Sequence, residues 1–479
     1  MRREVLLPLI VACALFVENM DSTVLSTALP EIARDLHTDP VALKLALTSY
    51  LLSLAVFIPV SGWVADRFGA RPTFIAAIGV YLFGSICCAS GETLGGLVAS
   101  RFLQGIGGAM MVPVGRLVIL RSVPKSELVK SMAWLTIPAL IGPVVGPPLG
   151  GLIATYWHWR WIFLINIPIG LVGVAMAWRF MPDLREAEPR PLDVVGLLLS
   201  GLGLGLTIFG FSSLGGHLWP SHISAGVLLV GVLSMLGYVV HAQRHPNPLI
   251  DLNLFRLPTF RAGVVGGSLF RIGIGATPFL LPLMLQLGFG LTPLQSGSIT
   301  FISAVGAMFM KTLTARIFHR FGFRPTLIFS TLVASALLAT YGWFTPTSPY
   351  PLLLSVLLVG GLFRSLNFTG LNALTYDEVD AERMSQATSL SSMVQQLSLS
   401  LGVTLGAFAL TLSGFFRGTE STELANFTIA FTVIALVSAS SIVFFARLSP
   451  DAGQELAGRK PVARPRDSEP PIETPVSTP

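Results

Sequence analysis

Long apolar blocks separated by short polar stretches run along almost the whole sequence. Each block has about the 20 residues that a helix needs to cross a bilayer. Hydrocarbon offers the backbone no hydrogen-bond partner, so blocks of this kind are expected to be helices. Fourteen spans are predicted near 5–29, 45–65, 73–91, 94–120, 132–154, 161–181, 192–212, 222–241, 261–286, 294–316, 325–345, 351–374, 386–413 and 426–447. The pattern predicts an all-α polytopic membrane protein.

The amino-acid composition supports a membrane protein and excludes a water-soluble globular protein. Of 479 residues, 52% are hydrophobic and only 12% are charged, whereas soluble domains carry about 25% charged residues. The net charge of +6 does not indicate a nucleic-acid partner, because Lys and Arg lie in short loops and form no basic stripe with aromatic residues. The expected surroundings are membrane lipid.

The placement of basic residues predicts the orientation. In the 14-span arrangement, 22 of the 31 Lys and Arg lie on the side of the N-terminus, four lie on the other side and five lie inside spans. Basic loops stay in the cytoplasm. We therefore expect a multi-pass protein of the inner (plasma) membrane with both termini cytoplasmic, an uncleaved first span, and a disordered cytoplasmic tail over 448–479.

An internal repeat divides the chain. The pattern Arg-Phe-Gly-x-Arg-Pro follows the second span at 67–72 and the tenth span at 320–325, an offset of 253. This predicts an N-terminal six-helix half at 1–185, an inserted hairpin and linker at 186–248, and a C-terminal six-helix half at 249–447. Repeated halves around a central site are typical of secondary transporters.

Five motifs resemble those of the major facilitator superfamily, and within it the 14-span drug:proton antiporter family. They are Met20–Asp35 in the first span, Gly62–Arg71 after the second, Arg101–Gly108 in the fourth, Gly142–Gly151 in the fifth and Trp159–Gly170 at the entry to the sixth. The resemblance covers residues 5 to about 447. The stretch 108–117 looks like the MdtD-type subgroup of multidrug transporters.

The resemblance implies a proton-coupled efflux antiporter that works by alternating access, with a small molecule and protons as its partners. We expect a monomer without a cofactor. A membrane enzyme is disfavoured because no loop offers a nucleophile and base or a set of metal ligands, and no phosphate-binding Gly-x-x-x-x-Gly-Lys-Ser/Thr motif occurs. A channel would need pore-lining symmetry; saturation and dependence on a proton gradient would distinguish it.

Two motifs carry predicted mechanical roles. The charges of the loop after the second span can stabilise one conformation of the transporter, or they can simply keep this loop in the cytoplasm as a topology signal. The candidate gating residues are Gly62, Asp66, Arg67, Gly69 and Arg71. In the second copy His319 replaces Asp66. The glycine- and proline-rich run of the fifth span permits close packing and kinks, and the resemblance associates it with export; ordinary packing stays open. Its residues are Gly142, Pro143, Gly146, Pro147, Gly150 and Gly151.

Ionisable residues inside spans are candidates for function because a charge at mid-bilayer costs about 2.5–3.5 kcal/mol on insertion scales. Of 25 Asp and Glu, only Glu18 and Asp21 fall inside a span, three positions apart on one helix face. We expect a proton-coupling site at Asp21 first and Glu18 second, with Arg101 as partner. A purely structural Asp21–Arg101 pair is the alternative.

Five basic residues lie inside spans and outnumber the two acids, which predicts a cavity that prefers an organic anion such as a polycarboxylate or its metal chelate. They are Arg101, Arg116, Arg271, Lys311 and Arg364. Two alternatives stay open: Arg116 and Lys311 can extend their charged ends to the membrane surface, and the other arginines can brace neighbouring helices. Further predicted cavity residues are Asn367, Asn372, Ser389, Ser392 and Gln396, for which hydrogen bonding between helices is the alternative. The three cysteines show no metal-ligand spacing, so no metal site is expected.

Overall fold

The computed structural model describes residues 3–122, 128–185, 192–213, 220–245, 248–249, 251–380, 383–454 and 456. Regular structure in these ranges is helical, and they contain no strand. Thirteen helices of the described chain are long and apolar enough to cross a membrane. The expected fifth span coincides with a fourteenth helix, α5 (Leu128–Tyr156). The predicted all-α membrane architecture is confirmed.

Six spans form the N-terminal half, and the sixth is broken at Ile165 into two helices. The elements are α1 (Arg3–Asp35), the 3-10 turn η1 (Pro40–Leu43), α2 (Lys44–Phe68), α3 (Ala70–Ala89), α4 (Leu94–Ser122), α5, α6 (Trp161–Leu164) and α7 (Asn166–Phe180). The inserted hairpin is α8 (Val194–Ser213) and α9 (Ser221–Arg244).

The C-terminal half begins with a span that contains π-helical turns and includes the elements α10 (Pro258–Arg261), η4 (Ala262–Gly266), α11 (Gly267–Leu283) and η5 (Met284–Gly288), after the 3-10 turn η3 (Leu252–Arg256). The other elements are α12 (Pro293–Phe321), α13 (Phe323–Tyr341), α14 (Tyr350–Leu374), α15 (Met384–Arg417), α16 (Leu424–Ser440) and α17 (Ile442–Ala446).

Several helices extend beyond the apolar blocks that predict them. The first span is expected to end near residue 29, but α1 continues through Pro30 to Asp35. Its last turn is polar and contains an Arg34–Glu31 ion pair of 2.8 Å. A helix does not have to stop where hydrocarbon stops, so hydropathy alone underestimates the length of this one.

The internal repeat is visible in the backbone of two turns. Gly69 joins α2 to α3 with φ +101°, and Gly322 joins α12 to α13 with φ +82°. Each glycine N–H donates to the carbonyl four residues earlier, Ala65 at 2.9 Å and Phe318 at 2.8 Å. A side chain at this φ would be strained. The repeated sequence pattern therefore encodes the same turn twice.

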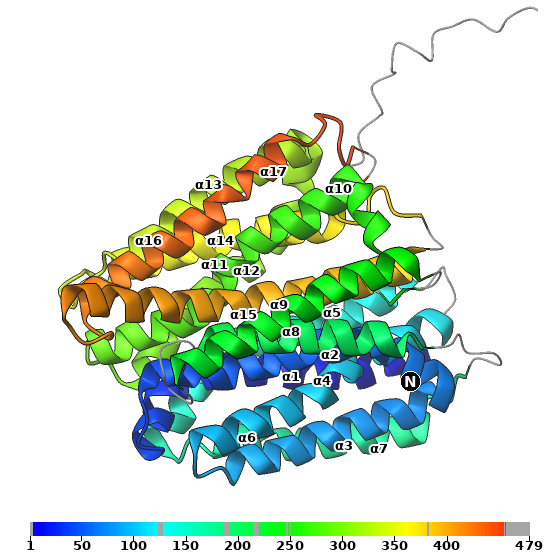
Figure 1. Ribbon diagram of the computed structural model, residues 1–479, viewed down its shortest axis with the longest axis horizontal. Coiled ribbons are helices and arrows are strands. Elements are labelled where there is room, and N and C mark those ends of the chain that lie inside the picture. Colours follow the sequence, from blue (N-terminus) through cyan, green and yellow to red (C-terminus); the bar gives the residue numbers. More distant parts are fainter. Residues whose placement is uncertain are drawn as a thin grey trace, which may run out of the picture.

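The start of α1 and the end of α17 lie on the same face of the bundle, toward the right of Figure 1. We call it the terminal face and the opposite one the far face. One apolar cluster near the far face combines both halves, with Leu29 and Ile32 beside Phe279 and Leu283. Two further clusters each belong to a single half. A fourth cluster joins Leu52 on α2 to Met393 on α15 together with the hairpin residues Ile208 and Tyr238. The halves therefore share one core near the far face and a second one beneath the hairpin.

The hairpin covers the junction between the two halves in the middle of the view in Figure 1. Figure 1 shows α8 and α9 in green, beside α2 and α15. Ser212 on α8 and Thr404 on α15 are hydrogen-bonded at 2.7 Å, while much of α9 is exposed. The predicted domain boundaries stay a prediction, and most of the predicted tail lies outside the described residues.

Candidate functional site

A cavity of about 190 Å³ lies between the halves. Side chains of α1 and α5 from the N-terminal half line it, together with side chains of α11, α12 and α14 from the C-terminal half. Thr23 and Ser26 represent α1, and Pro143 and Pro147 represent α5. A site formed by both halves changes shape when the halves move relative to each other.

Two of the predicted basic residues reach this cavity. Arg364 on α14 and Lys311 on α12 line it, and Nη2 of Arg364 donates to Oγ of Ser303 at 3.2 Å. The lining residues in the described chain include no Asp or Glu. The cavity is therefore positively charged.

Lys311 also borders a larger pocket of about 710 Å³ near the terminal-face ends of α12 and α14. Its lining includes His319, Gly370 and Leu456. Because Lys311 belongs to both linings, this pocket adjoins the cavity on the terminal-face side.

Contacts between the halves close the cavity toward the far face. Nε2 of Gln286 in η5, which follows α11 directly, donates to the Thr27 carbonyl on α1 at 2.7 Å. The Leu294 N–H at the start of α12 donates to Oγ1 of Thr155 on α5 at 3.1 Å. Together with the shared apolar cluster, these bonds form the far-face seal.

The glycines of α5 explain how the helices approach so closely. A Cβ on Gly142, Gly146 or Gly150 would meet atoms of α1, and one on Gly151 would clash with Pro293 and Leu294 on α12. Spacing of four residues places the first three on one face, the small-residue pattern of close helix pairs. The predicted antiporter motif thus packs α1, lines the cavity and forms part of the far-face seal.

Asp21 lies in a buried polar network of the N-terminal half. One of its oxygens, Oδ2, accepts from Nη1 of Arg101 at 2.5 Å, and the other accepts from Gln104 at 3.2 Å and Asn166 at 3.0 Å. Gln104 also donates to Ser85 at 2.8 Å. Asp21 is 0% exposed and Arg101 is 1% exposed. We call Asp21, Ser85, Arg101, Gln104 and Asn166 the Asp21 network.

Arg101 has further partners on α2. Its Nε donates to the Ala46 carbonyl at 3.4 Å, and its guanidinium lies 4.3 Å from the centre of the Tyr50 ring. Removing one member of such a buried ion pair typically costs about 3–5 kcal/mol. The structure pairs Asp21 with Arg101, as expected, and does not test a role in proton coupling. Asp21 lies on a different side of α1 from Thr23 and Ser26, which line the cavity.

Glu18 has a different environment. Its Oε2 is buried and has no hydrogen-bond partner among the described residues, and the same holds for the hydroxyls of Tyr50 and Tyr81. Glu18 interacts electrostatically with Arg116 and Asp21. It is a buried acid that the surrounding protein leaves incompletely bonded.

The other predicted cavity residues do not line the cavity. Arg271 is 1% exposed, and donates to the Gly263 carbonyl at 3.2 Å and to Asn372 at 2.9 Å. Asn367 donates to Ser330 and Thr331 of α13. Arg116 is exposed, whereas Ser389, Ser392 and Gln396 are half-buried on α15.

The predicted gating loop contains one ion pair that joins two helix ends. Nη1 of Arg121, in the last turn of α4, contacts Oδ1 of Asp66 in the last turn of α2 at 2.9 Å. A Cβ on Gly69 would clash with Asp183, so the segment after α7 packs directly against this turn. Gly62 and Arg67 are exposed, and Arg71 is half-buried.

Sequence reasoning missed three members of the Asp21 network: Ser85, Gln104 and Asn166. A signal existed for two of them, since Gln104 and Asn166 are strongly polar residues inside predicted spans, and Gln104 follows Arg101 by one helical turn. Ser85 carries no comparable signal, because serine is common in membrane helices.

Two six-helix halves around a shared cavity, with a hairpin between them in sequence, define a membrane transport protein and not an enzyme. The chain belongs to the Major Facilitator Superfamily, whose family model matches residues 11–403 and 263–477. A protein of Salmonella heidelberg (strain SL476) named "Putative multidrug resistance protein MdtD" is 38% identical over 458 residues, 93% of this chain and 95% of that protein. The protein of the same name from Salmonella typhimurium is equally similar.

Solved structures of the superfamily share the fold at low identity. A D-xylose–proton symporter gives a TM-score of 0.67 at 14% identity, over 93% of this chain and 98% of that chain. The human organic anion transporter MFSD10 gives 0.59 at 14% identity, over 93% and 100%. These likenesses establish the arrangement of helices and nothing about the substrate.

Proposed function

We propose that this protein is a proton-coupled efflux antiporter of the inner membrane that exports small molecules, of multidrug type, by alternating access. The observation that carries this proposal is the cavity between the halves, which adjoins a pocket toward the terminal face and is sealed toward the far face. Rocking of the halves would break the far-face seal and expose the cavity on the other side. The names of the 38% identical relatives support the substrate class.

The direction of export follows from the proposed orientation. In the predicted 14-span arrangement 22 of the 31 Lys and Arg lie on the side of the N-terminus, and because basic loops stay in the cytoplasm, we infer that the terminal face is cytoplasmic. The structure then corresponds to the state that loads substrate from inside the cell.

We propose Glu18 as the group that takes up the proton, with the Asp21 network as its fixed charged neighbour. A coupling acid has to change protonation during each cycle. Both oxygens of Asp21 are occupied by bonds from Arg101, Gln104 and Asn166, whereas Glu18 Oε2 has no described partner. This revises the order expected from the sequence, in which Asp21 came first.

Reconstitution tests the function directly. The purified protein in proteoliposomes, with a pH-sensitive dye inside, should release protons from an acidic lumen when a transported compound is added outside, and the rate should saturate. A cationic probe such as tetraphenylphosphonium represents the multidrug class. Proton movement that is absent for every compound, or that never saturates, contradicts the antiporter.

A second candidate is export of an organic anion, which the positive lining of the cavity favours. Arg364 and Lys311 face it without an acidic counterpart in the described lining, and a carboxylate would satisfy the guanidinium with paired hydrogen bonds. In the same proteoliposomes a tricarboxylate such as citrate should drive proton release in place of the lipophilic cation. A response to the cation alone excludes this candidate.

A further inference from the structure

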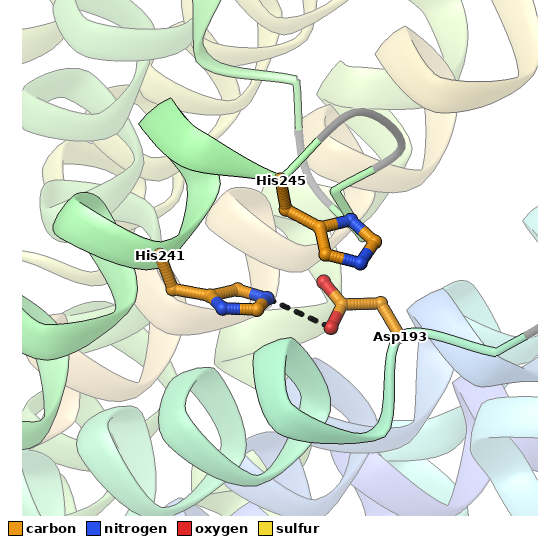
Figure 2. Close-up of side chains that lie close together, drawn as sticks. All are labelled: Asp193, His241 and His245. Carbon is orange, nitrogen blue, oxygen red and sulfur yellow. Dashed lines mark hydrogen bonds and ion pairs between the residues drawn. The ribbon is translucent and has the colours of Figure 1, made fainter.

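A second group of chemically active side chains lies outside the transport site, at the terminal-face end of the hairpin. Asp193 immediately precedes α8, and His241 and His245 lie at the end of α9. One ligand atom from each residue lies within 4.8 Å of the others. Figure 2 shows the carboxylate next to both imidazole rings. We call these three residues the hairpin cluster.

The cluster has the dimensions of a metal site. Nε2 of His241 and Oδ1 of Asp193 are 2.9 Å apart, and the two rings stack with centres 5.0 Å apart. Histidines four positions apart share one helix face. A tetrahedral ion with bonds of about 2.0–2.1 Å holds its ligand atoms roughly 3.3 Å apart. Small side-chain rotations therefore bring all three ligands onto one ion.

Asp193 is oriented by bonds from the backbone. The Gly196 N–H donates to Oδ1 at 2.8 Å, and the Leu249 N–H donates to Oδ2 at 3.1 Å. Burial raises the pKa of Asp193, but its hydrogen bonds from Gly196, His241 and Leu249 outweigh burial and hold that pKa below its ordinary value. The two backbone bonds thus fix the orientation of the carboxylate, as outer contacts do for a metal ligand.

The end of α9 also favours a cation. Carbonyl oxygens at a helix C-terminus carry partial negative charge. Arg244 stands in the same turn, but it is exposed, so solvent screens its repulsion.

We propose that Asp193, His241 and His245 bind one divalent transition-metal ion of the Zn²⁺ class, with water in the remaining position. Two imidazoles and one carboxylate suit Zn²⁺ and similar ions, whereas Ca²⁺ and Mg²⁺ prefer oxygen ligands. Coordination through Nε2 requires the tautomer of His241 that carries its hydrogen on Nδ1, so binding replaces the hydrogen bond between His241 and Asp193 by two bonds to the ion.

The ion would join the start of α8 to the end of α9, and Asp193 is also bonded to a third segment. Asp193 starts α8, the histidines end α9, and Leu249 belongs to the segment that leads into the C-terminal half. The sequence predicts no metal site, because the cysteines carry no ligand spacing and Asp193 lies 48 positions before His241. Only the fold brings them together.

Titration of the full-length protein with ZnCl₂ tests the site. The protein is purified in detergent without a polyhistidine tag, stripped with chelator and studied by calorimetry. We expect one equivalent to bind, and His245→Gln to weaken the affinity at least tenfold. This variant retains the hydrogen bond between His241 and Asp193 as well as the α8 cap. His222→Gln, an exposed histidine at the other end of α9, should bind as the unmodified protein does.

Thermal unfolding provides a second readout that does not depend on calorimetry. Zn²⁺ should raise the unfolding midpoint of the unmodified protein and of His222→Gln, and should leave His245→Gln and Asp193→Asn unshifted. Asn at 193 keeps an oxygen for the helix cap, so the variant is expected to fold. Absence of saturable binding at one equivalent, or equal binding by His245→Gln, overturns the proposal.

Discussion

The two acids inside the first span differ in how completely the protein satisfies them. Asp21 accepts bonds from Arg101, Gln104 and Asn166, whereas one oxygen of Glu18 has no described partner. From the sequence, Asp21 ranks above Glu18 as the coupling acid only because it belongs to a motif. The burial and hydrogen bonding of the two side chains depend on helices that are distant in the sequence. The Asp21–Arg101 pair is foreseen from the sequence, but the incomplete bonding of Glu18 is not.

This difference predicts opposite phenotypes for two amide substitutions. Glu18→Gln should leave the protein folded and abolish proton release driven by substrate, because the amide cannot take up a proton. Asp21→Asn should instead lower stability by about 3–5 kcal/mol, since it leaves Arg101 charged and unpaired in the interior. Thermal unfolding and proton release in proteoliposomes measure the two effects.

A double variant distinguishes structure from coupling at the Asp21 network. Asp21→Asn combined with Arg101→Met removes both charges, and replacement of a whole buried pair by apolar groups is often close to neutral. Stability should therefore recover relative to Asp21→Asn. If Glu18→Gln transports normally and the double variant is stable but uncoupled, the coupling acid is Asp21.

Two arginines that look alike in the sequence should respond differently to alanine. Arg364 lines the cavity, while Arg271 donates to Gly263 and Asn372 away from it. If the substrate is an anion, Arg364→Ala should weaken citrate binding at least tenfold and Arg364→Lys should restore only part, because lysine lacks the planar fork. Arg271→Ala should change stability and leave the affinity nearly unchanged. Equal losses of affinity for both alanine variants would contradict this division.

Helix α5 has two adjacent glycines that serve different contacts. A Cβ on Gly150 would clash within the N-terminal half, with Val24 and Thr27, and one on Gly151 would clash across the halves, with Pro293 and Leu294. The sequence shows a run of small residues and no more. The direction that each one faces depends on the rotation of α5 between α1 and α12.

Valine at these two positions should therefore separate folding from conformation. Gly150→Val should destabilise the protein by about 1–3 kcal/mol through overpacking. Gly151→Val should fold but weaken the far-face seal, so that a cysteine at Ala307, which lines the cavity, reacts faster with an impermeant maleimide added from the far face. Gly79→Val, with open space around its Cβ position, serves as the control.

Helix positions are the part of the fold that the sequence predicts best. Every predicted span coincides with a helix, because apolar length is a property of the local chain. The ends are less accurate: α1 reaches Asp35 and α15 reaches Arg417, beyond expected ends near 29 and 413. Polar terminal turns have no hydrophobic signal, and contacts that stabilise them come from other segments.

At the scale of the whole molecule, the start of α1 and the end of α17 lie on one face (Figure 1), which we propose to be the cytoplasmic one because basic loops stay in the cytoplasm. A reporter fused after Leu448 should therefore read cytoplasmic, and one inserted in the 214–221 loop between α8 and α9 should read periplasmic. Alkaline phosphatase and a fluorescent protein, active on opposite sides of the membrane, make the two readings independent. The reverse result for either fusion would overturn the proposed orientation.

The position of the hairpin predicts where the polypeptide chain can be interrupted. The halves are bonded to each other through α1 with η5 and through α5 with α12. None of these elements adjoins the hairpin in sequence, while α8 packs beside α2 and bonds to α15 (Figure 1). A continuous chain between α8 and α9 is therefore not required to hold the two halves together. Two separately synthesised polypeptides, one ending after α8 and one beginning before α9, should associate in the bilayer and form a complete transporter.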